Sequence, residues 1–327
     1  MAFAAVVQVI VPGCGGDVPA DKTEATTVQP LFVPRFDRDS AFHYVERQLS
    51  FGPRVPNTSA HRRCKDWLAE SFRSMGCEVT EQPFQARTYT GKTVDGVNIM
   101  ARFQPEAPRR ILLAAHWDSR FMADSPLNVE NSDSPIPGAD DGGSGVAVLL
   151  ELARQLQAHP VEIGVDFLLF DAEDQGSDSS VRPDPTSWCL GSQYWSRNII
   201  PGGYRPMYGI LLDMVGAKGA RFLREEVSMT YAPQVMNKVW KLAQGLGYGA
   251  YFVNETSGAV TDDHYFVNTI ARIPMIDIIG KSSTTPTGFG AHWHTQTDDL
   301  SVIDTRTLRA VGQTLLELIY REAAGRF

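Results

Sequence analysis

The chain has 327 residues, of which 43% are hydrophobic and 21% are charged. These proportions exclude a collagen-like, coiled-coil or wholly disordered chain. The formal net charge is −8, so the chain lacks the basic field that attracts proteins to nucleic acid, and we expect no nucleic-acid partner. No run reaches the roughly 20 apolar residues that a membrane-spanning helix needs, so we expect no transmembrane span.

The N-terminal residues have the pattern of an export signal. Residues 1–13 are almost wholly apolar and lead directly to Cys14, after which the sequence becomes polar. Residues 11–14 (VPGC) have the form of a bacterial lipobox, whose cysteine is lipidated. We therefore predict a signal segment over 1–14, a flexible tether over 15–34, and an exported, periplasmic protein anchored to the membrane through Cys14. The alternative is that the apolar run forms a buried first strand.

The next segments predict two helices and a hairpin. Apolar residues recur at spacings of three and four over 40–49 and 64–75, which is typical of amphipathic helices. Extended segments follow at 77–86 and 93–104, and Gly91 between them favours a turn.

Beyond residue 110, short apolar runs alternate with helical patterns. We expect strands at 111–115, 165–170, 208–214 and 272–279, and helices at 144–158, 190–198, 231–246 and 304–323. This alternation predicts an α/β fold, because buried strands separated by helices form parallel sheets. We expect a single domain over 35–327, with a central mixed, mostly parallel sheet and helices on both faces.

Acidic residues and histidines gather where the predicted strands end. The segments concerned are HWD at 116–118, GADDGG at 138–143, DAED at 171–174, Asp213, DDH at 262–264 and HWH at 292–294. Ligands bind outside the carboxyl ends of strands in open α/β sheets. Carboxylates that meet there without a cation repel one another, so the pattern indicates a metal site. Oxygen and imidazole ligands with an open position fit zinc.

The order of these segments resembles the zinc-aminopeptidase (M28-like) fold family and, within it, the animal-type glutaminyl cyclases and their bacterial branch. The likeness spans about 110–300 and the last helix. Its motifs are HWD at 116–118, GADDGGSG at 138–145, FDAED at 170–174, LLDMVGA at 211–217, DDHYF at 262–266 and WHT at 293–295. The cyclase likeness rests on GADD, on DDH, and on the Trp that directly precedes His in WHT.

The resemblance implies an enzyme that cyclises the N-terminal glutamine of peptides or proteins to pyroglutamate and releases ammonia. Asp141, Asp174 and His294 match the ligands of one Zn²⁺ ion per chain. Glu173 matches the general acid/base, and an acidic neighbour at the same strand end can bind the metal while Glu173 faces the substrate. The partners implied are glutamine-starting peptides, and with no interface signature we expect a monomer.

Further residues are carried over from the same resemblance. Asp213 and Asp262 match acidic residues that form a catalytic hydrogen-bond chain beside the general acid/base. Trp293 matches the aromatic wall that holds the substrate side chain, and Trp188 is a candidate second wall or, equally, a core anchor. Asp277, grouped with the substrate-binding residues, stands where the animal cyclases have His.

Two other interpretations stay open. In a two-zinc aminopeptidase of the same fold family, His116 and Asp213 would bind a second metal and Asp141 would bridge the two ions; every ligand for this is present. The apolar ring of Trp293 instead favours a small glutamine pocket. A non-catalytic relative that binds without metal is the third possibility, and the complete set of acidic residues and His294 argues against it.

Overall fold

The computed structural model describes residues 1–11, 13, 30–128, 132–177 and 184–327. Two units are separate, Met1–Leu31 and Phe32–Phe327, and the fold described below is that of the second. The predicted lipid anchor, Cys14, lies outside the described residues. Among the described helices, none combines the length and the apolar character needed to cross a bilayer.

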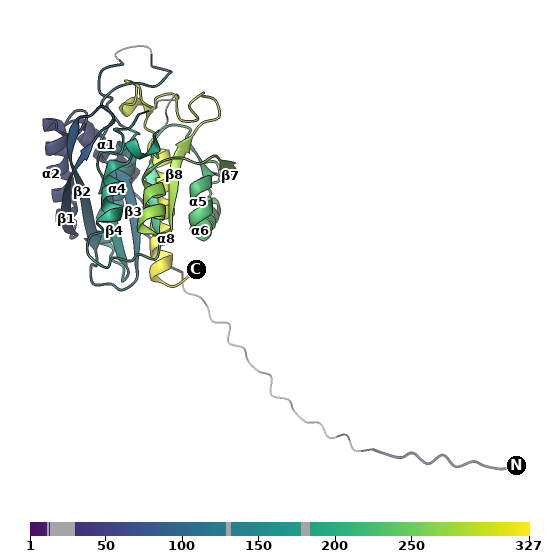
Figure 1. Ribbon diagram of the computed structural model, residues 1–327. Helices are drawn as coiled ribbons and strands as arrows, with labels where there is room; N and C mark the ends of the chain where they lie inside the picture. Colours follow the sequence, from purple (N-terminus) through teal and green to yellow (C-terminus); the bar gives the residue numbers. More distant parts are fainter. Residues whose placement is uncertain (12, 14–29, 129–131, 178–183) are drawn as a thin grey trace. The chain divides into compact units, whose positions relative to one another are not determined.

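Eight strands form one mixed sheet in the order β1-β2-β4-β3-β5-β8-β6-β7. They are β1 (Glu78–Arg87), β2 (Thr93–Phe103), β3 (Arg110–His116), β4 (Gly164–Phe170), β5 (Gly209–Asp213), β6 (Arg221–Glu225), β7 (Phe252–Ser257) and β8 (Met275–Lys281). The central strands β4, β3, β5 and β8 run parallel, whereas β1 and β2 are antiparallel and β6 is antiparallel to β8. Figure 1 shows β1 and β2 toward one edge and β7 at the other. The predicted mixed, mostly parallel sheet is confirmed.

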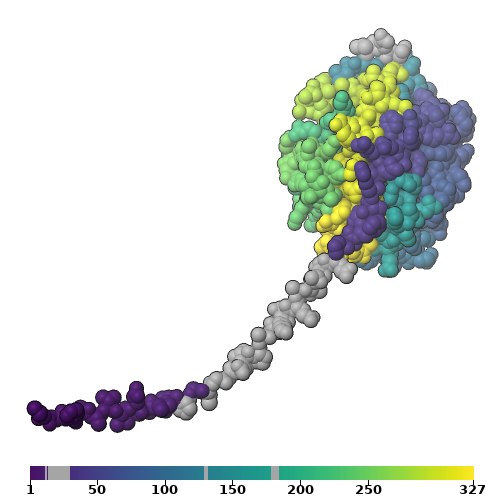
Figure 2. Space-filling model, turned by 180° about the vertical axis from the view of Figure 1, so that it is seen from behind, coloured from purple at the N-terminus to yellow at the C-terminus, as the bar shows by residue number. Residues whose placement is uncertain are grey.

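Helices cover both faces of the sheet, as predicted. They are α1 (Arg38–Leu49), α2 (Ser59–Ser74), α3 (Gly143–Ala158), α4 (Leu190–Arg197), α5 (Glu226–Tyr231), α6 (Pro233–Gly245), α7 (Asp263–Phe266) and α8 (Thr305–Ala323). Helices α1, α3 and α8 contact one another, and Figure 2 shows the purple α1 beside the yellow α8.

Neighbouring strand residues show how the two helical layers are held. Phe167 of β4 meets Phe72 of α2, with ring centroids 5.3 Å apart, while the next residue, Leu168, packs in the cluster that contains Trp195 of α4. Successive side chains of a strand point to opposite faces. A strand buried on both faces is therefore apolar throughout, which is why β4 was recognisable in the sequence.

The sequence did not predict β6, β7 or α7. The two strands are short and partly exposed, so they lack the continuous apolar run that marks β3 and β4. The predicted helix 231–246 begins at Pro233, which occupies the first turn of α6, because proline lacks the amide hydrogen that a helix interior uses.

Candidate active site

A cleft of about 510 Å³ lies beyond the carboxyl ends of the central strands. Residues from several of the predicted motifs line it, namely Asp141, Glu173, Asp174, Trp188, Asp213, Asp262, Trp293 and His294. Parallel strands end at the same edge of a sheet, and the loops that follow them meet there. The structure thus brings together residues that are more than 150 positions apart in the sequence.

The three predicted zinc ligands converge in this cleft. Each of Asp141, Asp174 and His294 offers a ligand atom, and these atoms lie within 4.8 Å of one another. His294 Nε2 lies 3.1 Å from Asp174 Oδ1 and 3.7 Å from Asp141 Oδ2. The buried Asp174 Oδ2 has no hydrogen-bond partner among the described residues. An oxygen and imidazole donor set with an unused buried oxygen fits a zinc ion.

Arg120 and Asp124 support two of these ligands from behind. The Nδ1 atom of His294 lies 3.2 Å from Asp124 Oδ1, so Nε2 is left to face the other ligands. The fully buried Arg120 donates from Nε to Asp124 Oδ1 at 2.7 Å and from Nη1 to the Asp174 carbonyl at 3.1 Å. Burial raises the pKa of Asp124, but Arg120 and His294 outweigh it and hold the pKa well below its usual range.

The loop that carries Asp141 is held by Asp298. The Asp298 carboxylate accepts hydrogen bonds from the backbone N–H groups of Asp140 and Asp141, at 2.8 and 3.1 Å. Gly142 follows with φ +78°, and a Cβ there would lie 2.8 Å from the carbonyl oxygen of Asp118. The conformation and the close approach both require glycine, which explains Gly142 within the GADDGG motif.

Glu173 is aimed into the cleft by the turn after β4. Ala172 has φ +53°, and the Asp118 carboxylate accepts hydrogen bonds from the backbone N–H groups of Glu173 and Asp174, at 3.0 and 3.2 Å. The Cys189 thiol donates to Glu173 Oε1 at 3.2 Å. Burial raises the pKa of Glu173 well above its usual range, although His116 partly opposes this.

Further carboxyl groups crowd around Glu173. Burial raises the pKa of Asp213 to about 8, and that of Asp262 is also raised. Among the described residues, Asp213 Oδ1, Asp262 Oδ2 and both carboxyl oxygens of Asp263 are buried without a hydrogen-bond partner. Acids packed this closely in a dry environment cannot all be ionised, so they share protons.

Asp277 lies outside the cleft lining. It is fully buried, and ligand-capable atoms of Asp262 and His264 lie within 4.8 Å of one of its own. The Nε2 atom of His264 lies 3.0 Å from the buried Glu225 Oε2. The structure therefore places Asp277 among the acids beside Asp262 and outside the residues that line the cleft.

His116 lies between two of the acids that a second metal would need. Its Nε2 atom is 3.0 Å from Asp141 Oδ1 and 3.3 Å from Asp213 Oδ1, and the three residues form another potential ligand group. Burial opposes a charge on His116, but contacts with Asp118, Asp141 and Asp213 raise its pKa well above the usual value. These acids therefore favour the protonated, positively charged form of His116.

Both predicted tryptophans lie beside the metal-ligand group. The Trp293 ring stacks on His294 with centroids 3.7 Å apart, and Trp188 lies nearly parallel to His294 at 6.0 Å. The Arg120 guanidinium carbon lies 4.6 Å from the Trp188 ring centroid. Phe289 packs against Trp293 at 5.0 Å. The ligands therefore face a slot with aromatic walls.

Several residues that shape the site were missed by the sequence predictions. They are Asp118, Arg120, Asp124, Cys189, Glu225 and Asp298. Asp118 stands inside the HWD motif, which offered a signal. Arg120 and Asp124 lie in an irregular loop, where no periodicity marks a partner.

Comparisons with known proteins agree with this geometry. The family model described as Peptidase family M28 matches residues 98–319. The crystal structure of Tannerella forsythia glutaminyl cyclase is 50% identical, with a TM-score of 0.85 over 88% of this chain and 99% of that chain. A Zn-dependent exopeptidase from Parabacteroides distasonis is 47% identical, with a TM-score of 0.86 over 88% of this chain and 99% of that one. The glutaminyl-peptide cyclotransferase of Drosophila melanogaster is 26% identical over 78% of this chain and 73% of its own.

Proposed function

The chain belongs to peptidase family M28, and from that premise we propose that it is a zinc-dependent glutaminyl-peptide cyclotransferase. It converts the N-terminal glutamine of peptides or proteins to pyroglutamate and releases ammonia. The observation that carries the proposal is one triad of metal ligands, flanked by tryptophans, in the same cleft as a glutamate backed by further acids. The likeness to solved glutaminyl cyclases supports it.

Asp141, Asp174 and His294 would hold the zinc ion. When bound, the ion supplies a Lewis acid that polarises the γ-carbonyl of the substrate glutamine. We propose one ion per chain, because a protonated His116 can neutralise Asp141 and Asp213 at the position where a second ion would bind.

The chain's own residues carry the proton and position the substrate. The Glu173 carboxylate takes a proton from the substrate's α-ammonium group, which frees the amine to attack the γ-carbonyl carbon. Glu173 then gives this proton to the leaving amide nitrogen, which departs as ammonia, and the second proton lost by the attacking nitrogen is taken up by the ammonia as ammonium, so the protons balance. Asp213 and Asp262, which line the same cleft, would share protons with Glu173 through this exchange. Trp293 and Trp188 keep the glutamine side chain folded, because the ring forms only when amine and carbonyl are already close.

A two-zinc aminopeptidase is the second candidate. It is favoured by the convergence of His116, Asp141 and Asp213 and by the relative named as a Zn-dependent exopeptidase. The two activities differ in product. The cyclase releases ammonia from glutamine-starting peptides, whereas the aminopeptidase releases a free N-terminal residue.

The deciding experiment offers the purified protein two peptides that differ only in their first residue, glutamine or alanine. Ammonia is measured by a coupled assay, free amino acids by chromatography, and zinc by atomic absorption. The cyclase proposal expects ammonia from the glutamine peptide, no free alanine, and one zinc per chain. Free alanine together with two zinc ions per chain would replace it with the aminopeptidase.

We also propose, from the sequence pattern alone, that the protein is exported to a bacterial periplasm as a monomer and anchored through a lipid on Cys14. The apolar residues 1–13 before Cys14 support this. Radiolabelled palmitate should be incorporated into the full chain and not into Cys14→Ser. Equal labelling of the parent and of Cys14→Ser would refute lipidation at Cys14. Size-exclusion chromatography with light scattering tests whether the protein is a monomer.

A further inference from the structure

A second cavity, of about 550 Å³, adjoins the catalytic cleft. Met214 and Lys281 line both cavities, so the two meet along a common wall. The remaining lining comes mainly from segments 217–221, 280–285 and 290–292. A peptide whose first residue occupies the catalytic cleft therefore has a second hollow within reach of its following residues.

The lining of this second cavity is rich in cations. It contains Lys218, Arg221, Lys281 and His292, and Asp140 is the only acid among the described residues that line it. Asp140 is already compensated, because its Oδ2 lies 2.8 Å from His292 Nε2 and its Oδ1 accepts the Gly216 N–H at 2.7 Å.

Two of these cations have no acidic partner in contact. Arg221 pairs with Glu255 at 2.6 Å, but in the described part of the chain neither Lys218 nor Lys281 lies within ion-pair distance of a carboxylate. At longer range Lys218 acts on Asp304, and Asp277, Glu225 and Asp213 act on Lys281, although burial still lowers the pKa of Lys281. The uncompensated charge of the cavity is therefore positive, in a chain whose net charge is −8.

Lys281 connects this charge to the catalytic cleft. Its Nζ lies 3.8 Å from the Phe289 ring centroid, and Phe289 packs against Trp293. Within the described residues, no acceptor takes a hydrogen bond from this ammonium. Beside it, the segment Ser282 to Thr285 adds hydroxyl groups to the cavity wall. A carboxylate entering here meets ammonium and hydroxyl donors together.

We propose that this cavity, which we call the lysine pocket (Lys218, Lys281 and segment 282–285), binds an acidic side chain of the substrate a few residues after its N-terminal glutamine. The inference rests on the proposed cyclase function and narrows its substrates to peptides with an early Asp or Glu. An extended peptide advances about 3.3 Å per residue, so the second to sixth residues reach up to about 16 Å beyond the glutamine. A free phosphate ion could bind the same ammonium and hydroxyl donors, and the experiment below distinguishes it from a peptide carboxylate.

The test is a glutamate scan of a short substrate. Hexapeptides that begin with glutamine and otherwise contain alanine carry one Glu, or its neutral isostere Gln, at each of positions two to six. We expect one position at which Glu raises kcat/KM about three- to fivefold over Gln, chiefly through KM, which is the size of an exposed ion pair. Because salt screens exposed charges, the preference should fall when sodium chloride is raised to 1 M.

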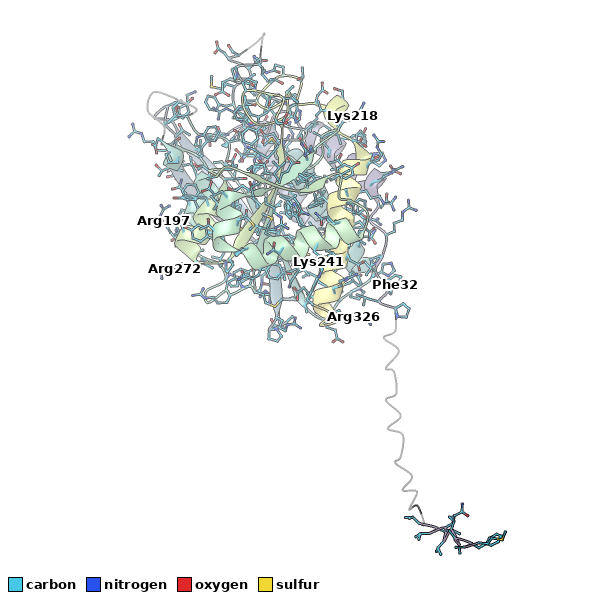
Figure 3. All side chains as sticks on the ribbon, turned by 90° about the vertical axis from the view of Figure 1, so that its right-hand side faces the viewer. Phe32, Arg197, Lys218, Lys241, Arg272 and Arg326 are labelled. Atoms are coloured by element: carbon cyan, nitrogen blue, oxygen red, sulfur yellow. The ribbon has the colours of Figure 1, made fainter. Side chains whose placement is uncertain are left out.

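Lys218→Met is the diagnostic variant, since Lys218 lines only the second cavity. It should lose the preference for Glu and keep the activity on the all-neutral peptide. Lys241→Met is the matched control, because Lys241 is an exposed lysine of α6 that Figure 3 shows on a separate part of the surface. A Glu preference that survives in Lys218→Met, or no Glu preference at any position, overturns the proposal.

Two further results keep the outcomes apart. No ammonia from any glutamine peptide would refute the cyclase function itself, whereas ammonia from all peptides at equal rates refutes only the lysine pocket. Inorganic phosphate should compete with the Glu peptide and leave the neutral peptide unaffected. A different result would show that the pocket binds a free anion and that the peptide proposal is wrong. In that case Glu is not preferred at any position, phosphate changes the rate for the neutral peptide, and Lys218→Met abolishes this effect of phosphate.

Discussion

The two halves of the catalytic cleft differ in the charge of the groups that contact their carboxyls. In the metal half (Asp141, Asp174 and His294), each ligand is backed by a group of opposite charge, such as Asp124 behind His294. In the acid half (Glu173, Asp213 and Asp262 of the lining, with the buried Asp277 behind them), carboxyls are packed against carboxyls, and buried oxygens of the last three have no hydrogen-bond partner among the described residues.

The pKa directions distinguish the individual carboxyls. In the metal half, His116 outweighs burial and lowers the pKa of Asp141, whereas burial and the neighbouring Asp141 raise the pKa of Asp174 despite the contact with His294. In the acid half, burial and neighbouring acids raise the pKa of Glu173 and Asp277 well above their usual values. Ligand carboxylates that face His116, His294 and Arg120 suit a bound cation, whereas carboxyls that mainly face other carboxyls suit the storage and transfer of protons.

Emptying the metal half should have the largest effect. Incubation with a chelator should reduce ammonia release by at least about a thousandfold, because the cation supplies several kcal/mol of charge stabilisation in such reactions. Stepwise return of zinc, followed by the ammonia assay, should restore full activity at one equivalent per chain. A requirement for two equivalents would contradict the single-ion assignment.

The second-largest loss of activity is expected when Glu173, at the centre of the acid half, is neutralised. Glu173→Gln keeps the shape of the side chain and removes its ability to carry a proton, so we expect a loss of about a hundredfold to a thousandfold in kcat. Zinc content by atomic absorption should be unchanged, since Glu173 belongs to the other half. Activity close to wild type would exclude Glu173 as the proton carrier.

Weakening the support of the metal half should have a smaller effect, seen in affinity more than in rate. Asp124→Asn removes the charge behind His294, and the zinc dissociation constant, measured by chelator competition, should rise about 10- to 100-fold. At saturating zinc most of the activity should return. The control is Asp133→Asn, because Asp133 is an exposed residue of the same loop, and this variant should bind zinc with the affinity of the parent. Unaltered zinc affinity in Asp124→Asn would show that the 3.2 Å contact between Asp124 and His294 does not orient the histidine ligand.

The smallest effect is expected at the back of the acid half. Burial and the acids Asp262, Asp213 and Glu225 raise the pKa of Asp277, and His264 and the cationic Lys281 also lie near it. The folded protein therefore holds a proton on Asp277 that the unfolded chain releases above its ordinary pKa of 3.8. Stability from this group is present at acid pH and is lost as the pH rises toward the folded pKa.

Asp277→Asn stays neutral at every pH and should escape this loss. By calorimetry, its melting temperature should exceed that of the parent by about 2 °C at pH 8, with a smaller difference at pH 5. The exposed Asp95→Asn is a control for a general effect of removing charge. A variant that melts well below the parent at pH 8 would mean that Asp277 is ionised in the fold.

The sequence could predict the main strands and the meeting of the strand-end residues, for one physical reason. Strands β3 and β4, buried on both faces, must be apolar along their whole length, so their ends are visible as changes of composition. Parallel strands end at one edge, so the residues that follow them must meet. That reasoning was sufficient to bring Asp141, Glu173 and Asp213 into one cleft.

Only the tertiary structure decided which of these acids are charged and which hold protons. The Asp124 contact with His294, the Cys189 bond to Glu173, and the burial of Asp277 behind Asp262 join segments that no periodicity links. Whether a carboxyl meets a cation or another carboxyl depends on side-chain packing across the fold, and that contact sets its pKa. The sequence alone therefore determined the membership of the cleft, and the fold decided its division into a metal half and an acid half.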